Sequence, residues 1–332
     1  MQERDWSAFS AFFQDKKNLL ITSHRTPDGD AIGSEVAMAH YLRQLGKSVH
    51  IVNLDATPKY FRFLDPVDEI TIFEPAAFAE LLPCLDGGVI VDINEWSRLA
   101  ELGRAIRTHG LPIACIDHHI PTEHVGTIEM IDTTVSSTGE LVFDFLDHSK
   151  ADWQQMIIDA LYTCLLTDTG SFRFSNTSPR THRIAAHLLS RGARYREVYK
   201  QVYESFSQNR IHLAGRLMAS IVFECGGKLA WFALPQEMLR ESGVQAWEIE
   251  GLSELPRSVE GVELSLMFSE TRDGLTKVSF RSAGTIPISG LAAAFGGGGH
   301  AFAAGATLNE PFEEAKQRVL AKTRAMLNEQ AA

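Results

Sequence analysis

The stretch Leu111-Pro-Ile-Ala-Cys-Ile-Asp-His-His119 decides how this chain folds. Its apolar run, Ile113 to Ile116, predicts a short buried strand, and the run stops at Asp117, His118 and His119. Such polar groups are costly to bury unless they are hydrogen-bonded or bound to a metal ion. In open α/β sheets, ligands bind beyond the carboxyl ends of the strands. The stretch therefore predicts a sheet edge that carries a functional site.

Three other segments of the chain end on acids or histidines in the same way. The apolar run Leu19–Thr22 leads into Ser-His-Arg-Thr-Pro-Asp-Gly-Asp, whose proline and glycine favour a tight turn into a helix. A second apolar run, Gly88–Val91, ends at Asp92, and a helical segment runs into Asp168. The candidate metal ligands at this edge are His24, Asp28, Asp30, Asp92, His118 and Asp168.

The chemistry of these side chains favours particular metal ions. Carboxylates and imidazoles without a thiolate suit a hard to borderline divalent ion such as Mn²⁺ better than a structural zinc ion. Six ligands exceed the need of one open site and suit two ions about 3.5 to 4 Å apart, which activate water and clamp a phosphoryl group. Taken alone, an acid such as Asp92 is more often a helix cap or turn residue than a metal ligand. Four such endings at one edge favour the metal site.

The order of the expected elements predicts the fold class. Strands and helices alternate in the N-terminal part, which predicts an α/β fold with a doubly wound, mostly parallel sheet. We expect strands at 19–22, 49–53, 88–91 and 113–116, and helices at 5–16, 31–45, 97–109, 138–147, 152–166 and 181–190. The stretch between the second and third strands and the stretch 120–137 have no clear pattern.

A smaller C-terminal α/β domain is expected after a helical segment. Its strands are expected at 221–225, 228–234, 262–269 and 276–281, with helices at 288–295 and 310–328. The Asp273-Gly274 pair is typical of a hairpin turn. We therefore expect a metal-binding domain at 1–192, a helical linker at 193–219 and a second domain at 220–330, with a cleft between the two domains.

Composition excludes several classes of protein. The 332 residues are 45% hydrophobic and 22% charged, which fits an ordinary globular protein of two domains. The net charge of −11 disfavours binding to long duplex nucleic acid. We expect neither a signal peptide nor a membrane-spanning segment, and hence a cytoplasmic protein. The four cysteines are widely separated in apolar surroundings, which predicts reduced, buried thiols.

The motifs together resemble a known family. The chain is similar to the DHH phosphoesterases that carry a DHH-associated C-terminal domain, in particular to the branch of oligoribonucleases and pAp phosphatases, and the resemblance covers essentially the whole chain. The motifs that carry it are His24-Arg-Thr-Pro-Asp28-Gly-Asp30, Asp92, Asp117-His118-His119, Asp168-Thr-Gly170 and Gly296-Gly-Gly-Gly-His300-Ala-Phe-Ala-Ala-Gly305.

The resemblance implies a role for each residue of the metal site. One ion is held by His24, Asp28 and Asp92. The other ion is held by the set Asp30, Asp92, His118 and Asp168. Asp92 and the nucleophilic water then bridge the two ions, and Asp117 orients a ligand histidine. The remaining catalytic candidate, His119, faces the scissile phosphate as a donor or acid.

The glycine-rich motif implies a substrate-binding site in the second domain. By resemblance, Gly298, Gly299 and His300 bind a substrate phosphate, together with Arg281 and Ser282 from the preceding strand. A glycine run also forms an ordinary flexible turn, and an arginine on a strand is often only solvated. Glycine-rich backbone followed by histidine nevertheless suits close approach to an anion.

These expectations together predict a Mn²⁺-dependent phosphoesterase. Its substrates would be short oligoribonucleotides (nanoRNA), cleaved to mononucleotides, and 3′-phosphoadenosine 5′-phosphate (pAp), converted to AMP. One alternative is a phosphodiesterase for cyclic di-AMP or its linear product pApA, and another is a nucleotide-binding module without catalysis. A pyrophosphatase or an exonuclease for long single strands of the RecJ type is disfavoured. Members of the family are often dimeric, so a homodimer is an open option.

Overall fold

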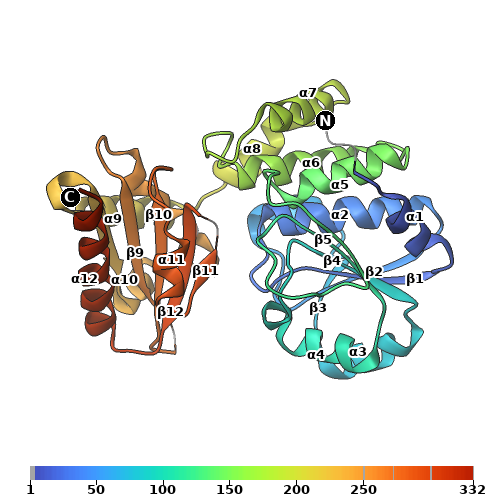
Figure 1. Cartoon of the computed structure of the whole chain (residues 1–332), viewed down its shortest axis with the longest axis horizontal. Coiled ribbons are helices and arrows are strands. Elements are labelled where there is room, and N and C mark those ends of the chain that lie inside the picture. The colour runs from blue at the N-terminus through green and yellow to red at the C-terminus, as the bar shows by residue number, and fades with distance from the viewer. Residues whose placement is uncertain (1–3, 250, 272, 300, 332) are drawn as a thin grey trace. The chain divides into compact units, whose positions relative to one another are not determined.

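In a computed structural model that describes residues 4–249, 251–271, 273–299 and 301–331, the chain divides into two units between Ser205 and Phe206 (Figure 1). Each unit has a six-stranded sheet. The segment expected as a helical linker, 193–219, contributes a helix to each unit: α8 (Tyr195–Tyr203) to the first and α9 (Gln208–Ala219) to the second.

The first sheet is parallel throughout and has the order β3-β2-β1-β4-β5-β6. Its strands are β1 (Asn18–Thr22), β2 (Ser48–Asn53), β3 (Ile70–Ile72), β4 (Gly87–Val91), β5 (Ile113–Asp117) and β6 (Ile128–Ile131). The chain proceeds outward from β1 to β3 and then returns to β4 on the other side of β1. This order confirms the doubly wound fold and places a switch point between β1 and β4.

Helices cover both faces of this sheet (Figure 1). One face is covered by α3 and α4, and the other by α2, against which α5 and α6 pack. The helices are α1 (Ser7–Gln14), α2 (Gly29–Gln44), α3 (Pro75–Leu81), α4 (Ala100–His109), α5 (Thr138–His148), α6 (Gln155–Asp168) and α7 (Pro179–Ser190), followed by α8. Because α2 lies between the sheet and α6, nearly all of its side chains are buried.

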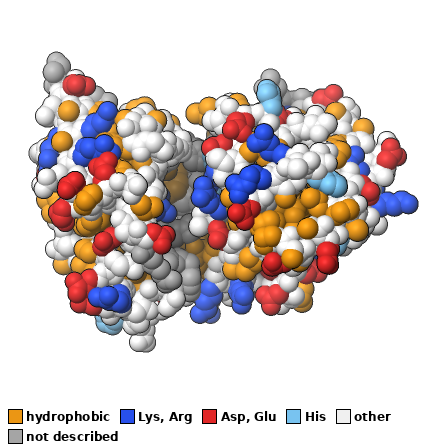
Figure 2. Space-filling view, turned by 90° about the horizontal axis from the view of Figure 1, so that it is seen from below, with side chains coloured by type: hydrophobic (Ala, Val, Ile, Leu, Met, Phe, Trp, Pro, Cys, Tyr) orange, Lys and Arg blue, Asp and Glu red, His pale blue; other side chains and the backbone are white. Residues whose placement is uncertain are grey.

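Three elements of this unit have no clear sequence pattern, namely β3, α3 and β6. The two strands are short edges of the sheet and none of their side chains is fully buried, so no alternation of apolar and polar residues appears. In α3 only Phe78 is fully buried, whereas Pro75, Ala76, Ala77 and Ala79 are exposed. Figure 2, seen from below, shows apolar side chains gathered on the face that carries α3 and α4. An exposed surface of alanine and proline hides the amphipathic pattern of a helix.

The second unit has a mixed sheet in the order β11-β12-β10-β9-β8-β7, in which only the β8–β9 pair is parallel among the described strands. Its strands are β7 (Val222–Glu224), β8 (Leu229–Leu234), β9 (Leu264–Glu270), β10 (Thr276–Ser282), β11 (Gly298–Gly299) and β12 (Ala303–Leu308). Its helices are α9, α10 (Gln236–Ser242), α11 (Ser289–Ala293) and α12 (Phe312–Ala331). The sheet and helices confirm the smaller α/β domain.

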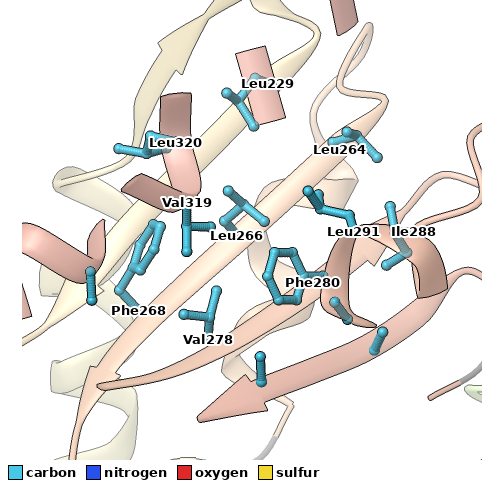
Figure 3. Close-up of a cluster of buried hydrophobic side chains, with 14 of the residues drawn as sticks. Leu229, Leu264, Leu266, Phe268, Val278, Phe280, Ile288, Leu291, Val319 and Leu320 are labelled. Atoms are coloured by element: carbon cyan, nitrogen blue, oxygen red, sulfur yellow. The ribbon is translucent and has the colours of Figure 1, made fainter. Parts of the chain in front are cut away.

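One hydrophobic core of this second unit lies between its sheet and the helices α11 and α12, and a second cluster joins α9 to β8. Figure 3 shows Phe268 and Phe280 from neighbouring strands packed with Val319 of α12 and Leu291 of α11. The expected hairpin is confirmed, because β9 and β10 pair antiparallel and Gly274 between them has φ +74°. Among the described residues, no helix has the length and apolar character needed to cross a membrane.

The packing of α2 on α6 depends on Gly33. A Cβ at this position would lie 2.5 Å from both the backbone oxygen of Ala160 and the Sγ of Cys164. We expect Gly33→Ala to lower the free energy of unfolding by about 1 to 3 kcal/mol, despite the higher helix propensity of alanine. Urea unfolding followed by circular dichroism measures the change.

The matched control is Gly215→Ala in α9, where a Cβ meets nothing within 4 Å. This substitution should stabilise the second unit by up to about 1 kcal/mol. Equal effects of the two substitutions would show that helix propensity, and not the contact of α2 with α6, decides the outcome at Gly33.

Candidate metal centre

The predicted metal-site residues meet at the carboxyl ends of the central strands. His24 follows β1, Asp92 follows β4 directly, and Asp117 is the last residue of β5. The switch point of the sheet lies between β1 and β4, where open α/β sheets bind ligands. The start of α2 brings Asp28 and Asp30 to the same place, and the last residue of α6 is Asp168.

Three groups of side chains at this edge have their ligand atoms within 4.8 Å of one another. The groups are His24 with Asp28 and Asp92, Asp30 with His118 and Asp168, and Asp92 with His118 and His119. Asp92 and His118 each belong to two groups. The first two groups together contain all six candidate ligands, divided as the family resemblance implies for two ions except that Asp92 belongs only to the first of them.

Asp92 lies at the centre of this arrangement. Its Oδ2 is 3.4 Å from His24 Nε2, and its Oδ1 is 3.6 Å from His118 Nε2 and 3.7 Å from His119 Nδ1. Burial acts to raise the pKa of Asp92, but the hydrogen bond from His24 and the neighbouring histidines hold that pKa well below its ordinary value. Asp92 has a left-handed backbone with φ 61°, an uncommon conformation that is concentrated at functional sites.

Asp30 and Asp168 show that the site concentrates negative charge. Burial raises the pKa of Asp30 well above its ordinary value, and the Asp92 and Asp28 carboxylates raise it further. Burial also raises the pKa of Asp168, with Asp30 as the next cause. The candidate ligands include four carboxylates and only two histidines, so negative charge is in excess. Divalent cations would supply the missing positive charge. The donor set of oxygen and imidazole nitrogen atoms fits ions such as Mn²⁺ or Mg²⁺.

Backbone N–H groups hold the side chains of Asp28 and Asp30 in place. Asp28 caps α2, because its Oδ1 accepts hydrogen bonds from the backbone N–H groups of Asp30 and Ala31 at 3.0 and 3.1 Å. The Asp30 carboxylate accepts from the N–H groups of Thr138 and Gly139 at 2.6 and 2.9 Å. Sequence reasoning missed Thr138 and Gly139, although Ser137-Thr-Gly-Glu140 has the pattern of a capping box.

Asp117 is in none of the three groups that could hold an ion among the described residues. Its Oδ1 lies 2.7 Å from His119 Nδ1 and accepts from the N–H of His118 at 2.8 Å. Asn94, which sequence reasoning missed, donates to Asp117 Oδ2 and to the carbonyl of His119. Burial lowers the pKa of His119, but the Asp117 hydrogen bond and the Asp92 charge outweigh it and raise the pKa. His119 is therefore a fixed, partly exposed imidazole that favours protonation.

A buried glutamate lies behind the metal site. Glu35 of α2 is fully buried, and its Oε2 accepts a hydrogen bond from Asn53 Nδ2 at 2.9 Å. The Asn53 side-chain oxygen accepts from the N–H of Ser23 at 3.4 Å, so the ends of β1 and β2 are linked to α2. Burial raises the pKa of Glu35 to about 7.

Of the residues predicted to bind substrate, Arg281 and Ser282 have hydrogen-bond partners within the second unit. Arg281 pairs with Glu254 at 2.5 Å, and Ser282 is buried with its Oγ accepting from the N–H of Gly284. His300 lies outside the described residues. The sequence does not reveal the partner of Arg281, because Glu254 is distant along the chain.

The glycine run has two different physical explanations. A Cβ on Gly297 would lie 2.1 Å from the carbonyl oxygen of Gly305, and a Cβ on Gly299 would lie 2.7 Å from that of Ala303. These glycines therefore permit β11 and β12 to approach each other. A Cβ on Gly298 meets nothing within 4 Å, so no contact within the described chain requires glycine there.

Comparison with known proteins agrees with these observations. The "DHH family, N-terminal domain" description matches residues 18–167, and the "DHHA1 domain" description matches residues 229–329. The bifunctional oligoribonuclease and PAP phosphatase NrnA of Thermus thermophilus is 33% identical over 314 residues, covering 93% of this chain and 90% of that protein. NrnA of Bacillus subtilis is 26% identical over 316 residues, covering 94% and 95%.

A solved structure has a similar fold over the whole length. The crystal structure of an exopolyphosphatase-related protein from Bacteroides fragilis matches with a TM-score of 0.88 and 28% identity, covering 97% of this chain and 96% of that one. Together with the sequence matches, it confirms the family resemblance that the motifs predict.

The raised pKa of Glu35 predicts a pH-dependent stability. The folded protein binds the Glu35 proton more tightly than the unfolded chain, so this contribution is present below the ordinary pKa of 4.5 and is lost as the pH rises through about 7. We expect Glu35→Gln to gain roughly 2 to 3 kcal/mol relative to wild type between about pH 5 and about pH 8. Urea unfolding of EDTA-treated protein at both pH values measures it.

Glu101→Gln is the control, because this glutamate on α4 is largely exposed. Its unfolding free energy should follow that of the wild type at both pH values. A constant difference between Glu35→Gln and wild type would mean that the Glu35 carboxyl titrates normally.

Proposed function

The chain belongs to the DHH family of phosphoesterases, and from this premise we propose that it hydrolyses short oligoribonucleotides to mononucleotides and pAp to AMP, with two Mn²⁺ ions as cofactors. The observation that carries the proposal is the arrangement of six ligand-type side chains, Asp92 among them, in two groups. Similarity to two NrnA proteins over most of their length supports the choice of substrates.

The two groups divide the ligands between the two ions. His24 and Asp28 would hold one ion and Asp30, His118 and Asp168 the other, with Asp92 shared between them. When bound, two such ions lower the pKa of a water molecule and neutralise the charge on the phosphoryl oxygens. The low pKa of Asp92 supports its shared role, because the carboxylate remains ionised.

His119 is suited to supply the proton that the reaction needs. Hydrolysis forms a bond from water to phosphorus and breaks the bond to a ribose oxygen, which must take up a proton as it leaves. The Asp117 hydrogen bond fixes one ring nitrogen of His119 and raises its pKa, so the other nitrogen can donate. Asp117 is thus proposed to orient His119 and, through its backbone contact, His118.

The second unit is proposed to bind the substrate phosphate. Gly298 supports this proposal, because its backbone is open to close approach and nothing within the described chain explains the missing side chain. Gly299, His300, Arg281 and Ser282 complete the proposed site. The Arg281 guanidinium would have to share its charge between Glu254 and the phosphate. The corresponding proposed division of the chain is catalytic at 1–192, linking at 193–219 and substrate-binding at 220–330.

A panel of substrates tests this function directly. With purified protein and Mn²⁺, we expect rapid turnover of RNA dimers to pentamers and of pAp, and slow turnover of a long single strand. Chromatography of the products measures each rate. Faster turnover of cyclic di-AMP or pApA would contradict the proposed substrate preference. No turnover of any of these substrates would favour a binding module.

Removal of a ligand tests the metal centre. We expect Asp92→Ala and His118→Ala to lose bound Mn²⁺, measured by elemental analysis, and to lower turnover by more than the roughly 10- to 100-fold cost of changing a supporting residue. EDTA should abolish the wild-type activity and Mn²⁺ should restore it.

The control for these variants is His124→Ala, because His124 is exposed and pairs with Glu129 outside the six candidate ligands. This variant should keep its metal and its turnover. Full Mn²⁺-dependent turnover in Asp92→Ala or His118→Ala would refute the assignment of the ligands.

A further inference from the structure

The first turn of α5 contacts two of the candidate ligands from the protein side. Thr138 Oγ1 donates a hydrogen bond to Asp92 Oδ1 at 2.9 Å, and the backbone N–H of the same residue donates to Asp30 Oδ2 at 2.6 Å. Thr138 therefore contacts Asp92, the carboxylate proposed to be shared by the two ions, and Asp30, which is proposed to hold one of them. On the basis of the proposed function, we propose that Thr138 is a positioning residue that sets the affinity of the centre for divalent cations.

The Thr138 hydroxyl does not cap its own helix. A threonine at the start of a helix commonly caps the backbone with its side chain. In α5, Ser137 does so, because its side chain accepts from the N–H of Glu140. The Thr138 hydroxyl is buried and is bonded to Asp92 instead. This use of the hydroxyl distinguishes a residue that orients a ligand from one that only stabilises a helix.

Asp92 particularly needs such support. Its carboxylate follows the strand directly on a left-handed backbone, and the Oδ1 that Thr138 contacts is also the oxygen near His118 and His119. A fixed donor on Oδ1 restricts rotation of the carboxylate and keeps its remaining lone pairs in a constant direction. The neighbouring Asp30 is fixed in the same way by two N–H groups at the start of α5.

The close approach of α5 to Asp30 depends on the residue after Thr138. A Cβ on Gly139 would lie 2.2 Å from Cys164 Cβ and 3.3 Å from Asp30 Oδ1. Only glycine therefore lets this first turn reach the carboxylate without displacing α6. The geometry of the Thr138 contacts is built into the packing of the two helices.

A buried ion pair fixes the turn from its other side. The Glu140 carboxylate is fully buried and accepts hydrogen bonds from Ser136 Oγ, from Thr181 Oγ1 at 2.6 Å and from Arg180 Nε at 3.1 Å. These partners join the first turn of α5 to the start of α7. The Thr138 hydroxyl thus belongs to a rigid segment, as a donor that orders a metal ligand requires.

The experiment compares Thr138→Val with Thr138→Ser. Valine keeps the branched shape and the backbone N–H but loses the hydroxyl, whereas serine keeps the hydroxyl. Titration calorimetry of EDTA-treated protein with Mn²⁺ should show affinity about 10- to 100-fold weaker for Thr138→Val and close to wild type for Thr138→Ser. The thermal unfolding temperature of the metal-free proteins reports on folding, and we expect it to be similar in all three.

Two results would overturn the proposal. One is wild-type Mn²⁺ affinity in a folded Thr138→Val protein, and the other is equal weakening by valine and serine, which would show that packing and not the hydroxyl matters. If valine prevents folding, Thr138→Ala also removes the hydroxyl and keeps the N–H to Asp30, and the same two criteria apply.

The binding measurement needs no substrate, so the two proposals can fail separately. The proposed function alone would be refuted if Mn²⁺ affinity depends on Thr138 but the wild-type protein hydrolyses none of the nucleotide substrates. Wild-type affinity in Thr138→Val, with normal hydrolysis of short oligoribonucleotides by the wild type, would refute the positioning role alone.

Discussion

Mutual repulsion among buried carboxylates is the constraint on which the rest of this structure depends. Asp30, Asp92 and Asp168 are brought together where burial opposes their charge. Histidines neutralise part of this charge, and the low pKa of Asp92 shows where their effect is largest. The rest is met by partial charges at helix ends, since the N–H groups of α2 and α5 point at Asp28 and Asp30. A site with this remaining excess of negative charge is suited to cations.

The sheet topology explains how such a cluster can be assembled from distant parts of the chain. Parallel strands all present their carboxyl ends at one edge, so residues after β1, β4 and β5 meet without a long loop. Helices complete the cluster, because α2 and α5 contribute their first turns and α6 contributes its last residue. The candidate ligands thus lie at the ends of strands and helices, an arrangement that helps to keep metal-ligand geometry constant.

The sequence predicted that these ionisable side chains would come together, because several of them follow an apolar run, as with Asp92 after β4. It did not predict Thr138 or Asn94, because a neutral side chain that bonds to a ligand carries no such signal and is recognised only in three dimensions. The exposed alanines of α3 and the half-buried edge strand β6 were missed since their burial pattern is weak. Local sequence patterns also do not predict ion pairs between distant residues, such as the pair of Arg281 with Glu254.

The glycine-rich motif shows why residues of one motif should not be assigned one role. Gly297 and Gly299 are explained by the close pairing of β11 with β12, since a Cβ on either would collide with backbone oxygen atoms. Only Gly298 lacks such an explanation, so it alone among these three carries an argument for a ligand. The same reasoning separates Gly139, which permits α5 to approach Asp30, from Thr138, whose hydroxyl is bonded to a ligand. Steric need within the chain is therefore the first explanation to test, and function is inferred where that need is absent.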